Sequence, residues 1–183
     1  MDKRKLPKAE LLRKLLSYDP ETGNLYWRER PREMFASDNA YSSWNTKYAG
    51  TEALTALTSG YRNGAIFKKP YRAHRVIWAL VHGEWPAGEI DHINGDRADN
   101  RISNLRDVSP AENMKNLKRR TSNTSGVNGV YWNKQRKVWH AQIRITRKVK
   151  HLGYFECIGS AAAARAVAEK KYGFHKNHGR EVA

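Results

Sequence analysis

Leucines recur at helical spacing near the start of the chain and give the first predicted element. Residues 6–18 read as an amphipathic helix, with Pro7 near its start and the Asp19-Pro20 pair after its end. The apolar face of this predicted helix consists of Leu11, Leu12, Leu15 and Leu16.

Short apolar runs separated by turn residues follow this helix. A turn over residues 19–24 leads into a predicted strand over 25–28. Residues 61–67 alternate between apolar and polar positions, and they pair in a predicted antiparallel hairpin with residues 71–74. Residues 29–50 carry aromatic side chains without a period, so the pattern predicts no regular element there.

The centre of the chain reads as a helix, a hairpin and a second helix. An apolar stripe predicts a helix over 75–81, and two short runs predict strands over 89–93 and 105–108. Asn94-Gly95 is a turn signal between the strands, followed by a polar loop. The second helix begins with an N-cap, a proline and a capping-box glutamate: Ser109, Pro110 and Glu112.

The C-terminal part reads as three strands and a helix. A basic segment rich in Ser, Thr and Asn, residues 119–126, is typical of a linker. The strands are predicted over 129–132, 138–145 and 148–155, and Ser160 is the predicted N-cap of a helix over 161–172.

These elements predict an α+β fold class with four segments. An N-terminal region of helix and hairpin occupies 1–73, and a hairpin-helix core occupies 74–118. The linker over 119–126 leads to a three-stranded sheet with a helix over 127–183.

Charge is strongly positive and unevenly distributed. The 183 residues carry a formal net charge of +16, which makes nucleic acid the leading class of partner. Residues 1–73 hold 14 Lys and Arg against 8 Asp and Glu, and residues 116–183 hold 15 against 3. Residues 74–115 hold 5 against 7. An acidic centre is therefore flanked by basic arms.

The cysteine count and the apolar runs exclude several classes of protein. Cys157 is the single cysteine, so the chain can form neither an internal disulfide nor a zinc site of several thiolates. Apolar runs are too short to span a membrane, and the N-terminus lacks the apolar core of a secretory signal. We expect an intracellular, cytoplasmic protein.

The predicted hairpin and helix bring together side chains suited to one metal and one base. The Asp91 carboxylate and the Asn113 amide oxygen suit Mg²⁺ or Mn²⁺, which prefer oxygen ligands. His92 is a candidate general base, and the Asn104 side chain is a candidate to orient its ring. A calcium-binding EF-hand loop is a weaker alternative, because its twelfth position from Asp91 is Ile102, where a glutamate is required.

Residues 91–105 resemble the HNH nucleases with the ββα-metal fold, in particular the homing endonucleases of phages. The chain matches the pattern D-H-I-x-G-x-x-x-D-N-R-x-x-N-L, and a helix with a final asparagine follows. The resemblance implies that Asp91 and Asn113 hold the metal, that His92 is the base and that Asn104 orients it. His74-Arg75 recurs in the same branch, and Arg75 is a candidate phosphate contact.

The C-terminal segment is similar to the DNA-binding domain of plant ethylene-response factors, whose three-stranded sheet lies in the major groove. The family's Arg-Gly-Val opening is Asn128-Gly129-Val130 here, so one expected arginine contact is missing. Either the face of Trp139 or the face of His140 could meet DNA. The resemblance implies DNA contacts at Tyr131, Trp132, Lys134, Arg136, Lys137, Trp139, Gln142, Arg144, Lys148 and Lys150.

Together these features predict a metal-dependent, site-specific DNA endonuclease of the homing type. His92 would deprotonate a water that attacks the phosphodiester of double-stranded DNA. A single predicted site and the lack of an apolar heptad seam predict a monomer that nicks one strand. The alternative is a non-catalytic DNA-binding regulator, for which the C-terminal half alone would suffice.

Overall fold

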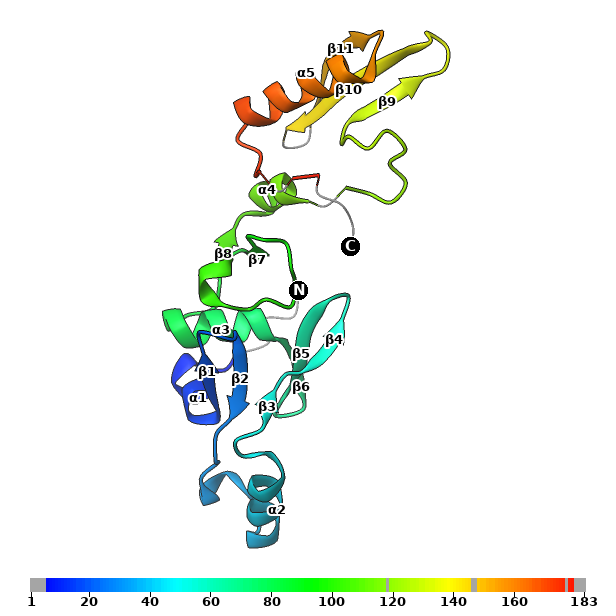
Figure 1. Ribbon diagram of the computed structural model, residues 1–183. Helices are drawn as coiled ribbons and strands as arrows, with labels where there is room; N and C mark the ends of the chain where they lie inside the picture. Colours follow the sequence, from blue (N-terminus) through cyan, green and yellow to red (C-terminus); the bar gives the residue numbers. More distant parts are fainter. Residues whose placement is uncertain (1–5, 118, 146–147, 177, 180–183) are drawn as a thin grey trace. The chain divides into compact units, whose positions relative to one another are not determined.

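The computed structural model describes residues 6–117, 119–145, 148–176 and 178–179 (Figure 1). Contacts divide the chain into two compact units, Met1–Asp107 and Val108–Ala183. The segment boundaries inferred from the sequence, at residues 73, 118 and 126, stay a prediction. The fold class is confirmed, since small antiparallel sheets and separate helices make up both units.

The first unit combines short helices with small sheets. Its helices are α1 (Ala9–Leu15), η1 (Arg32–Met34), α2 (Asp38–Tyr48), α3 (Ala73–His82) and η2 (Ile102–Asn104). Its strands are β1 (Leu16–Asp19), β2 (Asn24–Trp27), β3 (Glu52–Ala53), β4 (Ala56–Thr58), β5 (Tyr61–Ile66), β6 (Lys69–Arg72), β7 (Glu89–His92) and β8 (Leu105–Val108). They form sheets in the orders β1-β2-β3, β4-β5-β6 and β7-β8.

One apolar core joins these elements. Leu12 and Leu15 of α1 and Val76 and Ile77 of α3 are fully buried in it, and Leu105 at the start of β8 packs into the same cluster. Burial of these side chains supplies the main favourable free energy of this unit. Helix α3 is the element that links the N-terminal hairpins to β7 and β8.

The predicted N-terminal helix is too long by three residues at each end, since the observed helix begins at Ala9. It ends at Leu15, and Leu16–Asp19 is instead strand β1, paired antiparallel with β2. Leu16 has φ −135° and ψ 144°, is buried, and lies opposite Trp27. A leucine next to a helix can continue its apolar stripe or begin a buried strand, and here the pairing with β2 decides.

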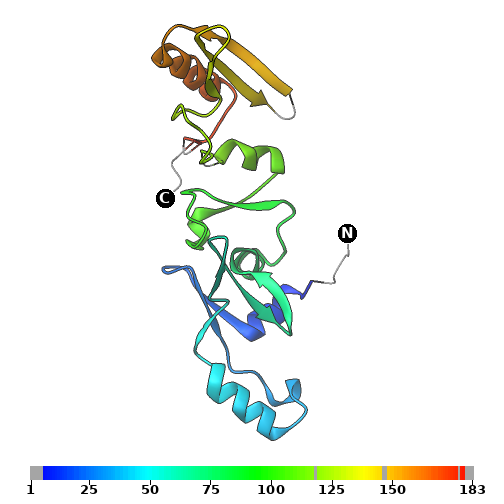
Figure 2. The same ribbon diagram turned by 90° about the vertical axis from the view of Figure 1, so that its right-hand side faces the viewer.

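The prediction of no regular element over 29–50 is wrong. Helix α2 has eleven residues, and its N-cap Ser37 accepts a hydrogen bond from Ala40 N at 3.2 Å. None of its residues is buried, so it has no apolar stripe for the pattern to detect. It is attached through aromatic rings outside the helix, with the Trp44 ring at 5.7 Å from that of Trp27 and 6.0 Å from that of Phe35. Figures 1 and 2 both place it at the opposite end of this unit from β7 and β8.

The boundary between the predicted strand over 71–74 and the helix over 75–81 also moves. Strand β6 ends at Arg72, and Ala73 and His74 already belong to α3. The predicted hairpin corresponds to β5 and β6, and its sheet has a third strand, β4, which the sequence pattern did not indicate.

The second unit begins with the short helix α4 (Pro110–Asn113), which has the predicted capping box at Ser109 and Glu112. The remaining elements are η3 (Met114–Asn116), β9 (Val130–Asn133), β10 (Val138–Ile145), β11 (Lys148–Phe155) and α5 (Ile158–Lys171). The sheet is antiparallel in the order β11-β10-β9. Val130, Ala141 and Ala161 form its core, so α5 covers one face of the sheet.

Helix α5 begins three residues earlier than predicted. Cys157 rather than Ser160 is its N-cap, and the Cys157 Sγ accepts from Ser160 N at 3.4 Å. Within the described residues no helix is long and apolar enough to cross a membrane.

Candidate active site

Strand β7 carries two buried ionisable side chains at its end. Asp91 is 7% exposed and His92 is 3% exposed. The strand is held in place by Ile93 N, which donates to Asn104 O at 2.9 Å, and by the turn in which Gly95 N donates to His92 O at 2.8 Å. A carboxylate and an imidazole are therefore held at consecutive positions where the strand ends.

An arginine on the partner strand orients the carboxylate. Arg106 of β8 donates from Nε and Nη2 to Asp91 Oδ2, at 2.9 and 2.7 Å. This charge-assisted pair compensates part of the cost of burying the carboxylate. Arg106 is not among the residues predicted from the sequence, because an arginine on a half-buried strand has no motif of its own.

The His92 ring is held by Asn100. The Nε2 of His92 and the Oδ1 of Asn100 are 3.1 Å apart, and Asn100 is 1% exposed. Since the amide oxygen can only accept, it places the ring proton on Nε2 and the basic lone pair on Nδ1. Burial lowers the pKa of His92 below its ordinary value, although the hydrogen bond to Asn100 and the charge of Asp91 oppose this.

The residue that holds the His92 ring is therefore Asn100, and not Asn104 as predicted from the sequence. Asn104 Oδ1 accepts from Asn94 N at 2.9 Å, and its Nδ2 donates to Asn94 Oδ1 and Asp99 O at 3.0 and 2.8 Å. Asn104 closes the loop between the two strands rather than contacting His92. Both asparagines belong to the same N-R-x-x-N pattern, so only the loop geometry distinguishes their roles.

The loop is further fixed by its own side chains. Asn94 Oδ1 accepts from Asp96 N, and Asn94 Nδ2 donates to Asp99 Oδ2, both at 2.8 Å. The Arg101 guanidinium, hydrogen-bonded to Asp99, lowers the pKa of that carboxyl to about 2. A loop with this many internal bonds holds Asn100 in a defined position.

The N-terminal hairpin supports the same loop from outside. Tyr18 Oη of β1 donates to Asn100 O at 3.3 Å and accepts from Ile102 N at 2.8 Å. Gly23 in the β1–β2 turn has φ +76°, and a Cβ there would lie 2.6 Å from Arg101 N. The close approach of these two backbones requires glycine.

A second histidine lies against the first. The rings of His74 and His92 are 5.2 Å apart at an interplanar angle of 87°, and Tyr61 lies 5.2 Å from His74 and 5.8 Å from His92. His74 is 4% exposed, and its Nδ1 has no hydrogen-bond partner among the described residues. Burial, with the nearby charges of His92, Arg72 and Arg75, lowers the pKa of His74 to about 3.

The other predicted residues of this centre have different surroundings. Arg75 of α3 donates from Nη1 to Gly88 O and from Nη2 to Pro86 O, at 3.0 and 3.3 Å. Both terminal nitrogens thus serve the loop before β7, which is a structural role. Asn113 is the last residue of α4 in the second unit. Its predicted place beside Asp91 stays a prediction.

The metal prediction can be tested against the chemistry of the donors. Among the described residues no group of three or more His, Cys, Asp or Glu side chains could hold a metal ion. The two predicted ligands, the Asp91 carboxylate and the Asn113 amide, are not a group of this kind, because they are only two and one of them is an asparagine. Asp91 does supply a buried, oriented carboxylate, which is the type of donor that Mg²⁺ and Mn²⁺ prefer.

The comparison with known protein families bears on this same segment. Residues 71–115 match the family model of the HNH endonucleases. The matched segment contains α3, β7, β8 and α4, and with them Asp91, His92 and Asn113. An HNH endonuclease match indicates nuclease chemistry for this part of the chain.

One curated relative is similar over part of the chain. Protein 3.8 of Escherichia phage T7 is 40% identical over 78 residues. The alignment covers 42% of this chain and 64% of that protein, less than two thirds of its length. No solved structure matches the chain.

The second unit has one open sheet face. Strand pairing puts Trp132 and Trp139 opposite each other on the side of Ala141, which α5 covers. Trp139 packs against the core, with its ring 5.3 Å from that of Trp132, which is 44% exposed. The other face carries a layer of aromatic and polar side chains from all three strands: Tyr131, His140, Gln142, Arg144, His151 and Tyr154.

The open face is built around a cluster of rings. The ring of His140 lies 4.5 Å from those of Tyr131 and His151, and 5.0 Å from that of Tyr154. The guanidinium carbon of Arg136, in the β9–β10 turn, lies 4.7 Å from the Tyr154 ring. Of the remaining predicted contacts, Lys134 and Lys137 lie in the same turn, and Lys148 and Lys150 are exposed on β11. Lys150 donates to Tyr172 Oη at 3.0 Å, beyond the end of α5.

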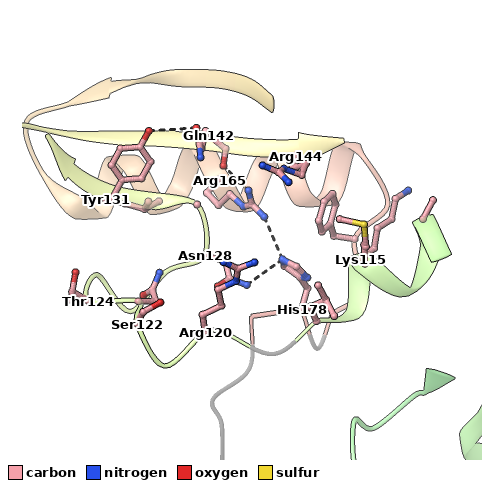
Figure 3. A pocket seen from close by; sticks show the side chains of 17 residues that line it. Lys115, Arg120, Ser122, Thr124, Asn128, Tyr131, Gln142, Arg144, Arg165 and His178 are labelled. Carbon is pink, nitrogen blue, oxygen red and sulfur yellow. Dashed lines mark hydrogen bonds between the residues drawn. The ribbon is translucent and has the colours of Figure 1, made fainter. Parts of the chain in front are cut away.

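A pocket of about 470 Å³ opens next to this face (Figure 3). Gln142 and Arg144 belong both to its lining and to the open face. Inside it, the buried Arg165 donates from Nη1 to Gln142 O at 2.5 Å and from Nε to Glu169 at 2.8 Å. The cationic side chains that line the pocket are Lys115, Arg120, Arg144 and Arg165.

Proposed function

We propose that this protein is a metal-dependent DNA endonuclease of the homing type that hydrolyses one phosphodiester at its HNH centre. The observation that carries the proposal is the buried Asp91–His92 pair, with Asn100 on His92 Nε2, within the segment that matches the HNH endonucleases. A sheet module that only binds DNA has no need of a buried base held in this way.

His92 is the general base in this proposal. Its lowered pKa keeps the imidazole neutral at pH 7, so it can accept a proton from water. With the ring proton on Nε2 toward Asn100, the proton from water goes to Nδ1. The resulting hydroxide attacks phosphorus, and the 3′ oxygen leaves.

Asp91 and Asn113 are the proposed ligands of Mg²⁺ or Mn²⁺. With the ion bound, the negative charge that develops on the phosphate and on the leaving oxygen is stabilised. Arg106 holds the Asp91 carboxylate in one orientation. The products would carry a 5′ phosphate and a 3′ hydroxyl, as the resemblance implies.

The open sheet face of the second unit is the proposed DNA-recognition surface, as in the ethylene-response-factor domain. Residues 108–183 hold 16 Lys and Arg against 4 Asp and Glu, a net charge of +12. Gln142 and Arg144 supply the amide and guanidinium groups that read base edges, and the cationic pocket beside them suits a phosphate. Trp139 drops out of the contact list because it packs in the core.

Two substitutions that each replace a positive charge with glutamine test this choice of face. Arg144→Gln should weaken binding of a labelled DNA duplex, because Arg144 lies on the open face. Lys150→Gln removes the same charge from the strand at the α5 side and should have a smaller effect. A larger loss for Lys150→Gln would reverse the choice of face.

The nuclease proposal is tested with purified protein and supercoiled plasmid. Cleavage should appear with Mg²⁺ or Mn²⁺ and disappear when a chelator is added. DNA binding without cleavage under every metal condition would instead support the non-catalytic regulator.

A further inference from the structure

Two arginines converge on one tyrosine beside His92. Tyr61 is the first residue of β5, and its ring centroid lies 4.3 Å from the guanidinium carbon of Arg72 and 4.8 Å from that of Arg97. The same ring contacts both His74 and His92, as described above. Two positive charges are thus gathered at the edge of the proposed catalytic centre by a single aromatic side chain.

Among the described residues, four arginines of the first unit are paired with carboxylates, and these two are not. Arg32, Arg62, Arg101 and Arg106 each form an ion pair with a carboxylate. Arg97 donates to a backbone carbonyl, Ser59 O, at 3.0 Å, and the side chain of Arg72 has no hydrogen bond or ion pair with any described residue. Both side chains are exposed. Their charge is therefore held in position without being neutralised.

The charge of Arg72 also reaches the histidine pair. It is one of the groups that lower the pKa of buried His74, after burial itself and the charge of His92. Guanidinium groups that face a reaction centre, and that carry no carboxylate partner of their own, are suited to bind phosphate oxygens in pairs of parallel hydrogen bonds.

We propose that Arg72 and Arg97 bind DNA backbone phosphates next to the phosphodiester that His92 attacks, and that Tyr61 is the positioning residue that holds both guanidinium groups there. This inference rests on the proposed nuclease function. It adds a phosphate-binding site in the first unit to the sheet surface proposed in the second. Neither arginine belongs to the set of residues that the sequence resemblance indicates.

The test measures binding separately from cleavage. The full chain with His92→Ala, without metal, is titrated with a labelled DNA duplex at a series of salt concentrations. Each lost phosphate contact should reduce the slope of log K against log salt by about 0.9. Arg72→Gln and Arg97→Gln should each show this reduction, and the double variant should lose about twice as much.

Lys47→Gln is the matched control for charge. Lys47 is exposed on α2, at the other end of this unit, so its loss should leave the slope at the value of the chain with His92→Ala alone (Figure 2). The inference is overturned if Arg72→Gln/Arg97→Gln keeps that same slope.

Two substitutions of Tyr61 separate positioning from general structure. Tyr61→Phe retains the ring that holds the guanidinium groups and should keep both the salt slope and the cleavage rate. Tyr61→Leu retains apolar volume without the ring, and should reduce the slope and raise KM more than it lowers kcat. Equal effects of the two substitutions would contradict the assigned role, with thermal unfolding used to confirm that both variants are folded.

The two levels of proposal fail in distinguishable ways. If the chain with His92→Ala cuts plasmid as fast as the unsubstituted chain, the nuclease proposal fails whatever the salt slopes are. If His92→Ala is inactive but the arginine variants bind DNA with an unchanged slope, the nuclease proposal stands and this phosphate site is refuted.

Discussion

Asn100 and Asn104 lie four positions apart, but their side chains have different partners. Asn100 makes one side-chain hydrogen bond, to His92, and its Nδ2 is buried with no partner among the described residues. Asn104 makes three, all within the loop. The first asparagine therefore orients His92, the proposed base, and the second stabilises the loop.

Alanine substitutions should separate these two roles. Asn100→Ala should lower the single-turnover cleavage rate about tenfold or more, because the His92 ring loses its orienting bond, while unfolding free energy falls by only about 1 kcal/mol. Asn104→Ala should cost about 2–4 kcal/mol of unfolding free energy, since three bonds are lost. Urea unfolding and single-turnover assays on both variants check this. The reverse pattern would return the orienting role to Asn104.

His74 should make the protein sensitive to acid. Its pKa is about 3 in the folded chain and about 6.5 in an unfolded one, so protons bind preferentially to the unfolded state. Above pH 6.5 His74 is neutral in both states, and its full contribution to the free energy of unfolding is present. As the pH decreases from 6.5 toward 3 this contribution is lost, and at pH 5 the free energy of unfolding is lower by about 2 kcal/mol. His74→Phe keeps an aromatic ring and removes the titration. Unfolding free energies at pH 7 and pH 5 should therefore differ less in the variant, and an equal difference would refute the assignment.

At the scale of elements, the β1–β2 hairpin connects the N-terminal region to the candidate active site. Its turn packs on the backbone of Asn100 and Arg101 through Gly23, and Tyr18 holds the same segment. Disturbing the hairpin should therefore disturb the base, although the hairpin carries no predicted catalytic residue.

Two glycines with the same backbone conformation test this connection. Gly23 and Gly50 have φ +76° and +77°, but a Cβ at Gly50 would meet nothing within 4 Å. Both alanine variants bear a strain of about 1–2 kcal/mol. Gly23→Ala additionally forces the Asn100 segment to move, so it should lose more unfolding free energy and most of its cleavage rate. Equal stability and activity in the two variants would contradict the link.

The sequence predicted the elements whose side-chain pattern is local. The capping box at Ser109 and the alternation along β10 specify their elements without help from distant residues. Helix α2 was missed because its attachment depends on rings from other segments, such as Trp27. Asp91 and His92 were found through their motif, whereas Asn100, Arg106 and Tyr61 depend on contacts that only the folded chain creates.

For the whole molecule, the proposed division of labour is one cleavage centre and one separate recognition sheet. Because the chain supplies one Asp91–His92 pair, a monomer should cut one strand at a time. Supercoiled plasmid should accumulate as open circle before linear DNA appears. Gel time courses at several protein concentrations check this. Direct conversion to linear DNA, at a rate that rises with the square of the concentration, would require a dimer.

The central claim is that His92 is the base of a nuclease and not an anchor for DNA. The most direct measurement compares the unsubstituted chain with His92→Ala, in plasmid cleavage with Mg²⁺ and in binding of a labelled duplex without metal. We predict that cleavage falls by a factor of about 100 or more, while the dissociation constant changes by less than about threefold. Cleavage by His92→Ala at the rate of the unsubstituted chain would contradict the account.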